Sequence, residues 1–303
     1  MNNAESEEKT EFKSGYVAIA GAPNAGKSTL LNKLLGFKIS ITSKKPQTTR
    51  NKILGVVHRP LSQLVFIDTP GIFKANNALN IKIVDAALST FGDVDIILIV
   101  GDAANPDSKS ESILIKNMES INKPVVLALN KIDIVDKSKL LEIIIQWEKR
   151  FDFKAVVPVS AKSAEGVEDL LCVLENILPP GPAFFPEDML TDVPERFVAA
   201  EMIREKIFRL TGQEIPYASA VTIDSFTDKK NKGLVAIEAT IHIERDSQKG
   251  IIIGKNGSKL KQIGIEARQE IEQLIGKKVF LQLFVKVDKD WSKNDRTLKQ
   301  FLY

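Results

Sequence analysis

The chain has 303 residues, of which 44% are hydrophobic, and its 42 lysines and arginines against 39 aspartates and glutamates give a formal net charge of +3. It is long enough to bury two cores, and so small a net charge gives no general indication of a nucleic-acid partner. No apolar stretch approaches the roughly 20 residues that span a bilayer, and the single cysteine excludes an internal disulfide bond.

The N-terminal segment 1–13 is polar and rich in acidic residues. It lacks both the apolar core of a signal peptide and the basic, acid-poor character of a transit peptide, so we expect a disordered lead-in. Cys172 falls on a predicted amphipathic helix over 166–178. We predict that this cysteine lies in the core and that the protein works in the reducing cytoplasm.

A glycine-rich loop, Gly21 to Ser28, joins a predicted strand over 16–20 to a predicted helix from Thr29 onward. It has the Walker A pattern in a strand–loop–helix setting, in which backbone amides and the helix N-terminus point at phosphate oxygens. Lys27 would add positive charge over the β and γ phosphates, and Ser28 would offer its hydroxyl to Mg²⁺. The alternative is a glycine turn that binds nothing. The predicted phosphate-binding residues are Gly21, Ala22, Pro23, Asn24, Ala25, Gly26, Lys27, Ser28 and Thr29.

A polar, basic segment over 40–50 follows the first helix and precedes a predicted strand near 51–57. A switch loop needs a hydroxyl that reaches Mg²⁺ only when the γ-phosphate is present. Thr48 and Thr49 could each do so, and their spacing does not choose between them.

The apolar run 64–67 ends in Asp68-Thr69-Pro70-Gly71. Asp68 would hold Mg²⁺ through water, and the amide of Gly71 would hydrogen-bond the γ-phosphate until hydrolysis breaks that bond. The alternative is an ordinary turn.

Asn130-Lys131-Ile132-Asp133 follows a predicted buried strand over 124–129, where ligands of open α/β sheets lie. The Asp133 carboxylate would accept hydrogen bonds from guanine, since adenine presents no matching pair of donors, and Asn130 would brace the loop. Ser160-Ala161-Lys162 follows the run 155–159, and the Ala161 amide is suited to contact the guanine edge. These motifs add Asp68, Thr69, Pro70, Gly71, Asn130, Lys131, Asp133, Ser160, Ala161 and Lys162 to the predicted GTP-binding residues.

Prolines at 179, 180 and 182 end the last helix of this part and place a boundary near residue 180. Beyond it the sequence predicts an amphipathic helix over 194–210 and strands over 219–223 and 234–243. The apolar positions of that helix are Phe197, Ala200, Ile203, Ile207 and Leu210.

The segment Gly250 to Gly257 contains a Gly-x-x-Gly loop, followed by a helical pattern of apolar residues at Leu260, Ile263, Ile265, Ala267, Ile271 and Leu274. Glycines in such a loop let a single-stranded RNA backbone approach closely, beside an apolar groove for unstacked bases. The alternative is a helix C-cap followed by an N-cap. The predicted RNA-binding residues are Gly250, Ile253, Gly254, Lys255, Asn256, Gly257, Lys259 and Lys261.

Local charge favours the RNA interpretation. Residues 245–303 contain 13 lysines and arginines against 7 acids, a difference of +6, whereas residues 187–244 contain 7 against 11, a difference of −4. The basic excess therefore surrounds the Gly-x-x-Gly loop.

In this order the phosphate loop, Thr48-Thr49-Arg50, Asp68 to Gly71, Asn130 to Asp133 and Ser160 to Lys162 resemble the translation-factor class of small GTPases. In that class's Thr-Thr-Arg subgroup the second threonine ligates the metal, so the resemblance favours Thr49. Together with a C-terminal KH domain, this arrangement closely resembles the Era family of bacterial GTPases over residues 14–303.

The resemblance implies an α/β P-loop GTPase domain over 14–178, with a mostly parallel sheet and helices on both faces. A linker over 179–193 and an α+β type II KH domain over 194–303 would follow. It also implies a cytoplasmic, monomeric protein that binds the 3′ end of 16S rRNA and assists assembly of the small ribosomal subunit. A peripheral membrane contact is a further implication, which the hydropathy of this chain does not demand.

The expected catalytic residues are Lys27, Asn24, Thr49 and Gly71. Ile72 and Phe73 follow Gly71, so the glutamine that some GTPases use to orient water is absent and we expect slow intrinsic turnover. Asn24 suggests potassium-stimulated hydrolysis, because related GTPases hold K⁺ with an asparagine at this point. The alternative is that Asn24 only braces the loop.

Two other functions compete with this interpretation. One is a metabolic P-loop ATPase or kinase, which Asp133 argues against. The other is a membrane-associated signalling GTPase whose second domain binds a protein partner.

Overall fold

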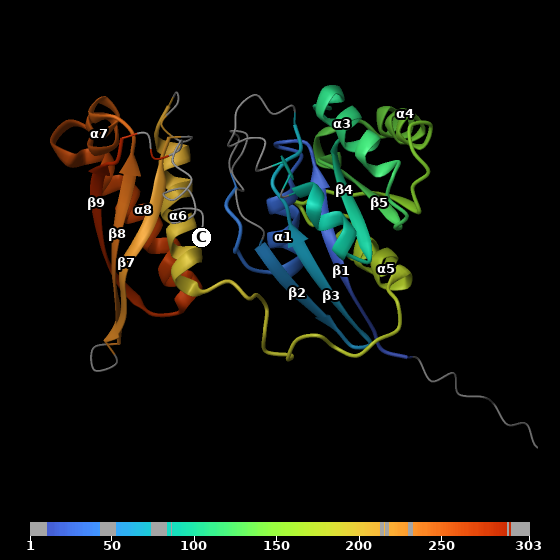
Figure 1. Ribbon diagram of the computed structural model, residues 1–303, viewed down its shortest axis with the longest axis horizontal. Coiled ribbons are helices and arrows are strands. Elements are labelled where there is room, and N and C mark those ends of the chain that lie inside the picture. The colour runs from blue at the N-terminus through green and yellow to red at the C-terminus, as the bar shows by residue number, and fades with distance from the viewer. Residues whose placement is uncertain are drawn as a thin grey trace, which may run out of the picture.

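The computed structural model describes residues 11–42, 53–73, 84–85, 87–212, 215, 218–229, 233–289 and 291. They form two units joined by one extended segment after α5 (Figure 1). The first unit runs from β1 to α5, and the second from α6 to β9.

The first unit is built on a six-stranded sheet in the order β2-β3-β1-β4-β5-β6. Only β2 and β3 pair antiparallel, and the other neighbours are parallel. The central strands are continuous apolar runs because both faces of the sheet are covered. The strands are β1 (Lys13–Gly21), β2 (Ile53–Arg59), β3 (Ser62–Asp68), β4 (Ile96–Asp102), β5 (Val125–Asn130) and β6 (Ala155–Pro158).

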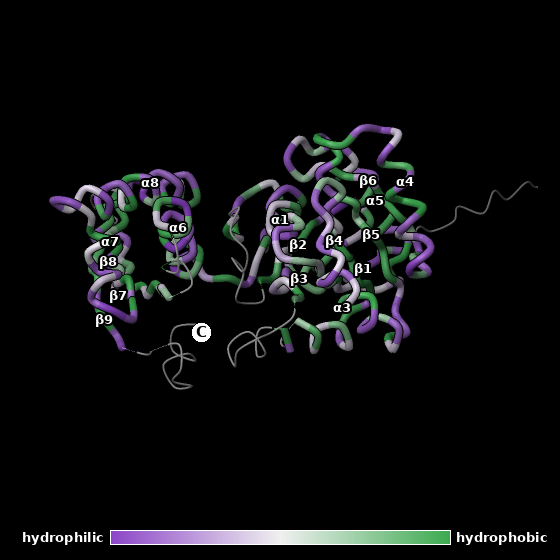
Figure 2. Tube along the Cα trace, turned by 90° about the horizontal axis from the view of Figure 1, so that it is seen from above, coloured by the Kyte–Doolittle hydropathy of each residue, from purple (hydrophilic) through white to green (hydrophobic). Residues whose placement is uncertain are grey.

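Helices pack on both faces of this sheet. α1 (Lys27–Leu35) and α5 (Val167–Ile177) share one apolar cluster with the sheet, and α3 (Ser108–Met118) and α4 (Lys137–Glu148) contribute to a second cluster. Short 3-10 turns lie at Thr90–Asp93 and Ile132–Ile134. Seen from above, much of the strand-rich middle of this unit is hydrophobic and much of its outer trace is hydrophilic (Figure 2).

The second unit is a three-stranded sheet in the order β7-β8-β9, with β7 antiparallel and β9 parallel to β8. Helices α6 and α8 pack together against it, and its core includes Ala200, Ile203, Ile207, Ile237, Ile241, Ile263, Ala267 and Ile271. The elements are α6 (Glu195–Leu210), β7 (Ala220–Lys229), β8 (Leu234–Ile243), α7 (Asp246–Ile253), a 3-10 turn at Lys255–Gly257, α8 (Ser258–Ile275) and β9 (Lys278–Val287).

The structure corrects the prediction for β7, which continues to Lys229 and not only to residue 223. Pairing with β8 resumes after an irregularity between Ile223 and Ser225. The sequence did not predict this second half of β7, because its polar residues interrupt the apolar pattern by which a strand is recognised in a sequence.

Two side chains also lie where the sequence did not place them. Cys172 is exposed, since the buried face of α5 is formed by Val167, Leu170, Leu171 and Leu174. Ile265 is 42% exposed, because Ile263, Ala267 and Ile271 recur at a spacing of four along α8 and a residue two positions away faces elsewhere.

The segment expected to be a linker, 179–193, lies along β2 and β3. The Val56 amide donates to the Leu190 carbonyl at 2.8 Å, and the Thr191 hydroxyl donates to the Leu54 carbonyl at 2.6 Å. The buried Gln63 accepts from the amides of Phe184 and Phe185. These bonds anchor the connection to the second unit on the edge of the first sheet.

No helix in the part of the chain that the structure describes is long and apolar enough to cross a membrane.

Candidate nucleotide site and Gly-x-x-Gly loop

The loop between β1 and α1 is fixed by the surrounding core. Gly26 has φ +99°, and a Cβ there would lie 2.2 Å from the Asn130 Nδ2 atom. A Cβ at Gly21 would lie 2.5 Å from the Val100 carbonyl oxygen. Side chains are therefore excluded from both glycine positions by space, and at Gly26 also by backbone conformation.

Lys27 is buried inside this loop, where its ammonium donates to the Gly21 carbonyl at 3.2 Å and the Ala22 carbonyl at 2.9 Å. Burial lowers the pKa of Lys27 to about 8, and the attraction of Asp68 offsets that effect only in part. A bound phosphate group would add negative charge beside this buried ammonium and favour its protonated form.

A hydroxyl and a carboxylate meet beside the loop. Ser28 Oγ, at the start of α1, donates to Asp68 Oδ2 at 2.9 Å, and Asp68 is fully buried at the end of β3. Ser40 Oγ donates to the same oxygen at 3.0 Å. The Ser28 hydroxyl and the Asp68 carboxylate are hard oxygen donors that fit Mg²⁺. Thr48 and Thr49, one of which is expected to complete the set, lie outside the described residues.

The segment after Asp68 packs on the phosphate loop. Thr69 Oγ1 donates to the Ile19 carbonyl at 2.8 Å, and the Ile72 amide donates to the Gly21 carbonyl at 3.1 Å. A Cβ on Gly71 would lie 3.1 Å from the Pro23 nitrogen. The segment 68–71 therefore lies beside the phosphate loop, which is the position expected of residues that contact the γ-phosphate and Mg²⁺.

Asn130, at the end of β5, ties three motifs together. Its Nδ2 donates to the Ala25 carbonyl at 2.8 Å and its Oδ1 accepts from the Ala161 amide at 2.9 Å. The bracing role expected of Asn130 therefore has a definite geometry. The Ala161 amide, which is expected to contact guanine, donates to Asn130 in this structure. A guanine contact through this amide would therefore have to share its hydrogen with Asn130.

The predicted guanine-binding carboxylate lies beside the same motifs. Asp133 is exposed, and Ser160 Oγ donates to its Oδ1 at 2.8 Å. Lys162 is exposed, and Lys131 pairs with Asp102 at 2.5 Å. An exposed carboxylate held by one hydroxyl keeps acceptor capacity for a ligand.

Sequence reasoning missed two side chains in this region, Ser40 and Asp102. Asp102 ends β4 and also accepts from the amides of Ala104 and Asn105. Its position at the carboxyl end of a central strand was a signal that could have found it. Ser40 lies in the predicted switch segment, but nothing in its spacing indicated a bond to Asp68.

The second loop joins α7 to α8. Gly254 caps the end of α7, where its amide donates to the Gly250 carbonyl at 2.9 Å, and Gly257 is the N-cap of α8 with φ +76°. The C-cap and N-cap alternative therefore describes this loop correctly, and it is compatible with a Gly-x-x-Gly loop. Lys255 and Asn256 are exposed at its tip, and Lys261 is exposed on α8.

The phosphate loop with its Ser28–Asp68 pair, followed by a loop between two helices on a three-stranded sheet, defines the class of P-loop GTPases that carry a KH domain. Residues 16–131 match the family described as 50S ribosome-binding GTPase, and residues 214–292 match the KH domain family.

Two relatives and two solved structures support this assignment. Era of Geobacter sp. strain M21 is 54% identical over 293 residues, 97% of this chain and 98% of that protein. Era of Lactobacillus helveticus strain DPC 4571 is 48% identical over 98% of each chain.

A structure of an Aquifex aeolicus Era variant bound to GDP and AlF4⁻ is 40% identical, with a TM-score of 0.91, and the match covers 96% of this chain and 99% of that one. A structure of Era with MgGDPNP and nucleotides 1506–1542 of 16S ribosomal RNA is also 40% identical, with a TM-score of 0.91 and coverage of 96% and 98%. These matches show that the chain belongs to the Era family of GTPases, and they confirm the predicted family, two-part fold and GTPase class.

Proposed function

We propose that this protein is a GTP-hydrolysing switch whose KH domain binds the 3′ end of 16S rRNA and assists assembly of the small ribosomal subunit in the cytoplasm. The proposal rests on one observation: the same chain contains a Walker A loop, held in place by Asn130, and a Gly-x-x-Gly loop. The Era structure with MgGDPNP and 16S rRNA nucleotides supports it, because that relative is matched along 96% of this chain.

The proposed domain extents are 14–178 for the GTPase domain, 179–193 for the linker and 194–303 for the KH domain. Lys13 nevertheless belongs to β1 and hydrogen-bonds to Leu61. In the proposed site, amides of the phosphate loop and Lys27 bind the phosphates, and Asp133 selects guanine. Ser28, Asp68 through water, and Thr49 hold Mg²⁺, which neutralises phosphate charge when bound.

In the proposed cycle, GTP orders the segment 40–50 and the residues after Gly71, and hydrolysis releases them. Differential contact with the γ-phosphate drives the change. Asn24, exposed and at φ +63°, would hold K⁺. We expect hydrolysis to be faster in K⁺ than in Na⁺ at matched ionic strength, and equal rates would remove the potassium hypothesis.

The KH role is tested best at Gly257. The expected effect of Gly254→Asp is weaker RNA binding, but a Cβ there lies 2.8 Å from the Lys259 Cβ, so that variant also strains the protein. At Gly257 a Cβ meets nothing within 4 Å, and aspartate tolerates the left-handed backbone conformation. Gly257→Asp should therefore fold and weaken RNA binding by placing negative charge where the RNA backbone approaches.

Gly233 provides a matched control, since it has φ +57°, equally open surroundings and a position before β8, away from the loop. Gly233→Asp adds the same charge and should leave RNA binding unchanged. Equal RNA affinity of the two folded variants would refute RNA binding through the Gly-x-x-Gly loop.

The first experiment is binding of a labelled single-stranded RNA from the 16S 3′ end, with GDP and with a non-hydrolysable GTP analogue, at two salt concentrations. We expect tighter, sequence-selective binding with the analogue. Weak binding that ignores the nucleotide and disappears with salt would leave only a basic surface. It would favour the membrane-associated signalling GTPase with a protein partner, which vesicle binding without RNA would then test.

A further inference from the structure

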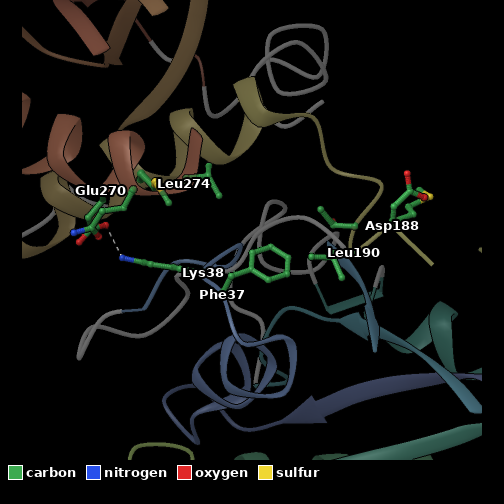
Figure 3. A pocket seen from close by; sticks show the side chains of 10 residues that line it. Phe37, Lys38, Asp188, Leu190, Glu270 and Leu274 are labelled. Carbon is green, nitrogen blue, oxygen red and sulfur yellow. Dashed lines mark hydrogen bonds and ion pairs between the residues drawn. The ribbon is translucent and has the colours of Figure 1, made fainter. Parts of the chain in front are cut away.

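The second unit contacts the first through residues 38–42, which overlap the start of the predicted switch segment 40–50. Lys38 Nζ pairs with Glu205 on α6 at 2.5 Å and with Glu270 on α8 at 2.7 Å. Figure 3 shows Lys38 reaching from the first unit toward Glu270. Four residues further on, the Thr42 hydroxyl accepts from Arg209 of α6 at 3.5 Å.

The same segment contacts the magnesium-site carboxylate. Ser40 Oγ donates to Asp68 Oδ2 at 3.0 Å. Asn32 of α1 holds the backbone between Lys38 and Ser40, because its Oδ1 accepts from the amides of Ile39 and Ser40 and its Nδ2 donates to the Ser40 carbonyl. The two contacts, with Asp68 and with the second unit, are thus joined by two residues of constrained backbone.

The ion pairs of Lys38 are built so that they can open. The side chain of Glu205 is fully buried, and a buried charge that loses its only partner is costly. Arg209 also pairs with Glu205, however, and Lys206 also pairs with Glu270. Each carboxylate therefore keeps a cation from its own unit when Lys38 withdraws.

The electrostatics of Glu270 agree with this arrangement. Its partial burial alone would raise its pKa, but hydrogen bonds from Lys206 and Lys38 hold the pKa below its ordinary value. The carboxylate is therefore charged at neutral pH and available to Lys38.

The packing beside these ion pairs is open. A cavity of about 850 Å³ lies between the two units, lined by Phe37 and Lys38, by the segment 188–191 and by residues of α6 and α8 such as Met202 and Leu274 (Figure 3). Contacts between domains that lack a close-packed apolar interface permit relative motion.

We propose that Lys38 is a positioning residue that couples the second unit to the magnesium site through Ser40. This inference rests on the proposed function of the nucleotide site. In the structure the Ser40–Asp68 bond and the Lys38 ion pairs are present together. Asp68 would hold Mg²⁺ through a water molecule, which would have to donate to the carboxylate that accepts from Ser40 here. Metal binding and the Lys38 ion pairs would therefore oppose each other. By linkage, a protein that lacks the ion pairs binds Mg²⁺ and nucleotide more tightly.

The test measures the Mg²⁺ concentration that half-saturates binding of a fluorescent, non-hydrolysable GTP analogue, without RNA. Lys38→Gln should lower that concentration about fivefold or more, the usual lower range of coupling between sites. Glu270→Gln should shift it in the same direction from the other side of the contact, and Lys38→Arg should restore the wild-type value. Ser40→Ala should also lower the half-saturating Mg²⁺ concentration. The double variant Lys38→Gln/Ser40→Ala should lower it no further than either single variant, because both substitutions break the same coupling.

Lys33→Gln is the matched control, since Lys33 is an exposed lysine on neighbouring α1. It should leave the Mg²⁺ requirement unchanged. A second readout is the distance between labels on the exposed native Cys172 and on a cysteine at the exposed Glu238. Mg²⁺ with the analogue should shift that distance in the wild type, and Lys38→Gln should shift it without Mg²⁺.

A folded Lys38→Gln protein with the wild-type Mg²⁺ requirement would overturn this inference, as would an equal shift in Lys33→Gln. If Lys38→Gln does not fold, Glu270→Gln decides in the same assay. A wild-type protein that binds no guanine nucleotide would instead refute the proposed function.

Discussion

The two glycine loops of this protein differ in what surrounds them. In the phosphate loop, Cβ atoms added to Gly21 and Gly26 would meet the Val100 carbonyl at 2.5 Å and the Asn130 amide at 2.2 Å. In the Gly-x-x-Gly loop, a Cβ at Gly254 would lie 2.8 Å from the Lys259 Cβ of the adjoining α8, and a Cβ at Gly257 would meet nothing within 4 Å. One loop is enclosed by the core of its domain, whereas the other projects from two helix ends.

This difference indicates how each loop holds its shape. The phosphate loop is held by distant parts of the chain, notably Asn130 through its bond to Ala25, so it is preorganised for its ligand. The Gly-x-x-Gly loop is held at the ends of α7 and α8, where the Gly254 amide donates to the Gly250 carbonyl and the Gly257 amide donates to the Gly254 carbonyl. Substitutions should therefore have global effects in the first loop and local effects in the second.

The largest effect is expected from Gly26→Ala. The new methyl group would displace Asn130, which cannot simply swing away because it also accepts from the Ala161 amide at 2.9 Å. We expect a loss of about 3 kcal/mol in nucleotide binding, or roughly a hundredfold in affinity, from backbone strain and the displaced brace. Calorimetric titration with GDP and a melting curve measure the two consequences.

Gly36→Ala is the control for this prediction. Gly36 caps the other end of α1 with φ +77°, and a Cβ there meets nothing within 4 Å. Gly36→Ala should introduce similar backbone strain but leave nucleotide affinity unchanged. Similar affinities for Gly26→Ala and Gly36→Ala would show that the enclosure of the phosphate loop does not matter for binding.

A smaller effect is expected from pH, because enclosure also changes the pKa of Lys27. Burial lowers that pKa to about 8, with Asp68 opposing the shift. A bound phosphate favours the protonated amine, so nucleotide binding takes up a proton above pH 8. Affinity should therefore fall about tenfold from pH 7 to pH 9. Lys27→Arg, whose side chain stays charged, should bind with little dependence on pH in this range, and a wild-type affinity that is flat with pH would contradict the expected shift.

The sequence predicted the phosphate-loop side of this comparison well, since its strand, loop and helix are contiguous and the chemistry of Lys27 and Ser28 follows from their spacing. It predicted the role of Asn130 as a brace but not its partners, because Ala25 and Ala161 are distant in the chain. Cys172 and Ile265 were misplaced, since a helical apolar pattern leaves its flanking positions ambiguous. The contact of Lys38 with Glu205 and Glu270 joins two domains and leaves no local pattern in the sequence.

The smallest effect is expected from Gly257→Ala, which tests the exposed loop by the change made at Gly26. With open space around the new methyl group, the only cost is the left-handed backbone conformation at φ +76°, about 1 kcal/mol in the free energy of unfolding. Gly276→Ala, at the end of α8 with φ +68° and equally open space, should cost the same. Only Gly257→Ala should also weaken RNA binding, by about fivefold, because its methyl group stands between the loop and the RNA backbone. RNA affinity and the denaturant midpoint are measured for both variants. Equal RNA affinity would mean that Gly257 is needed for the helix cap and not for RNA binding.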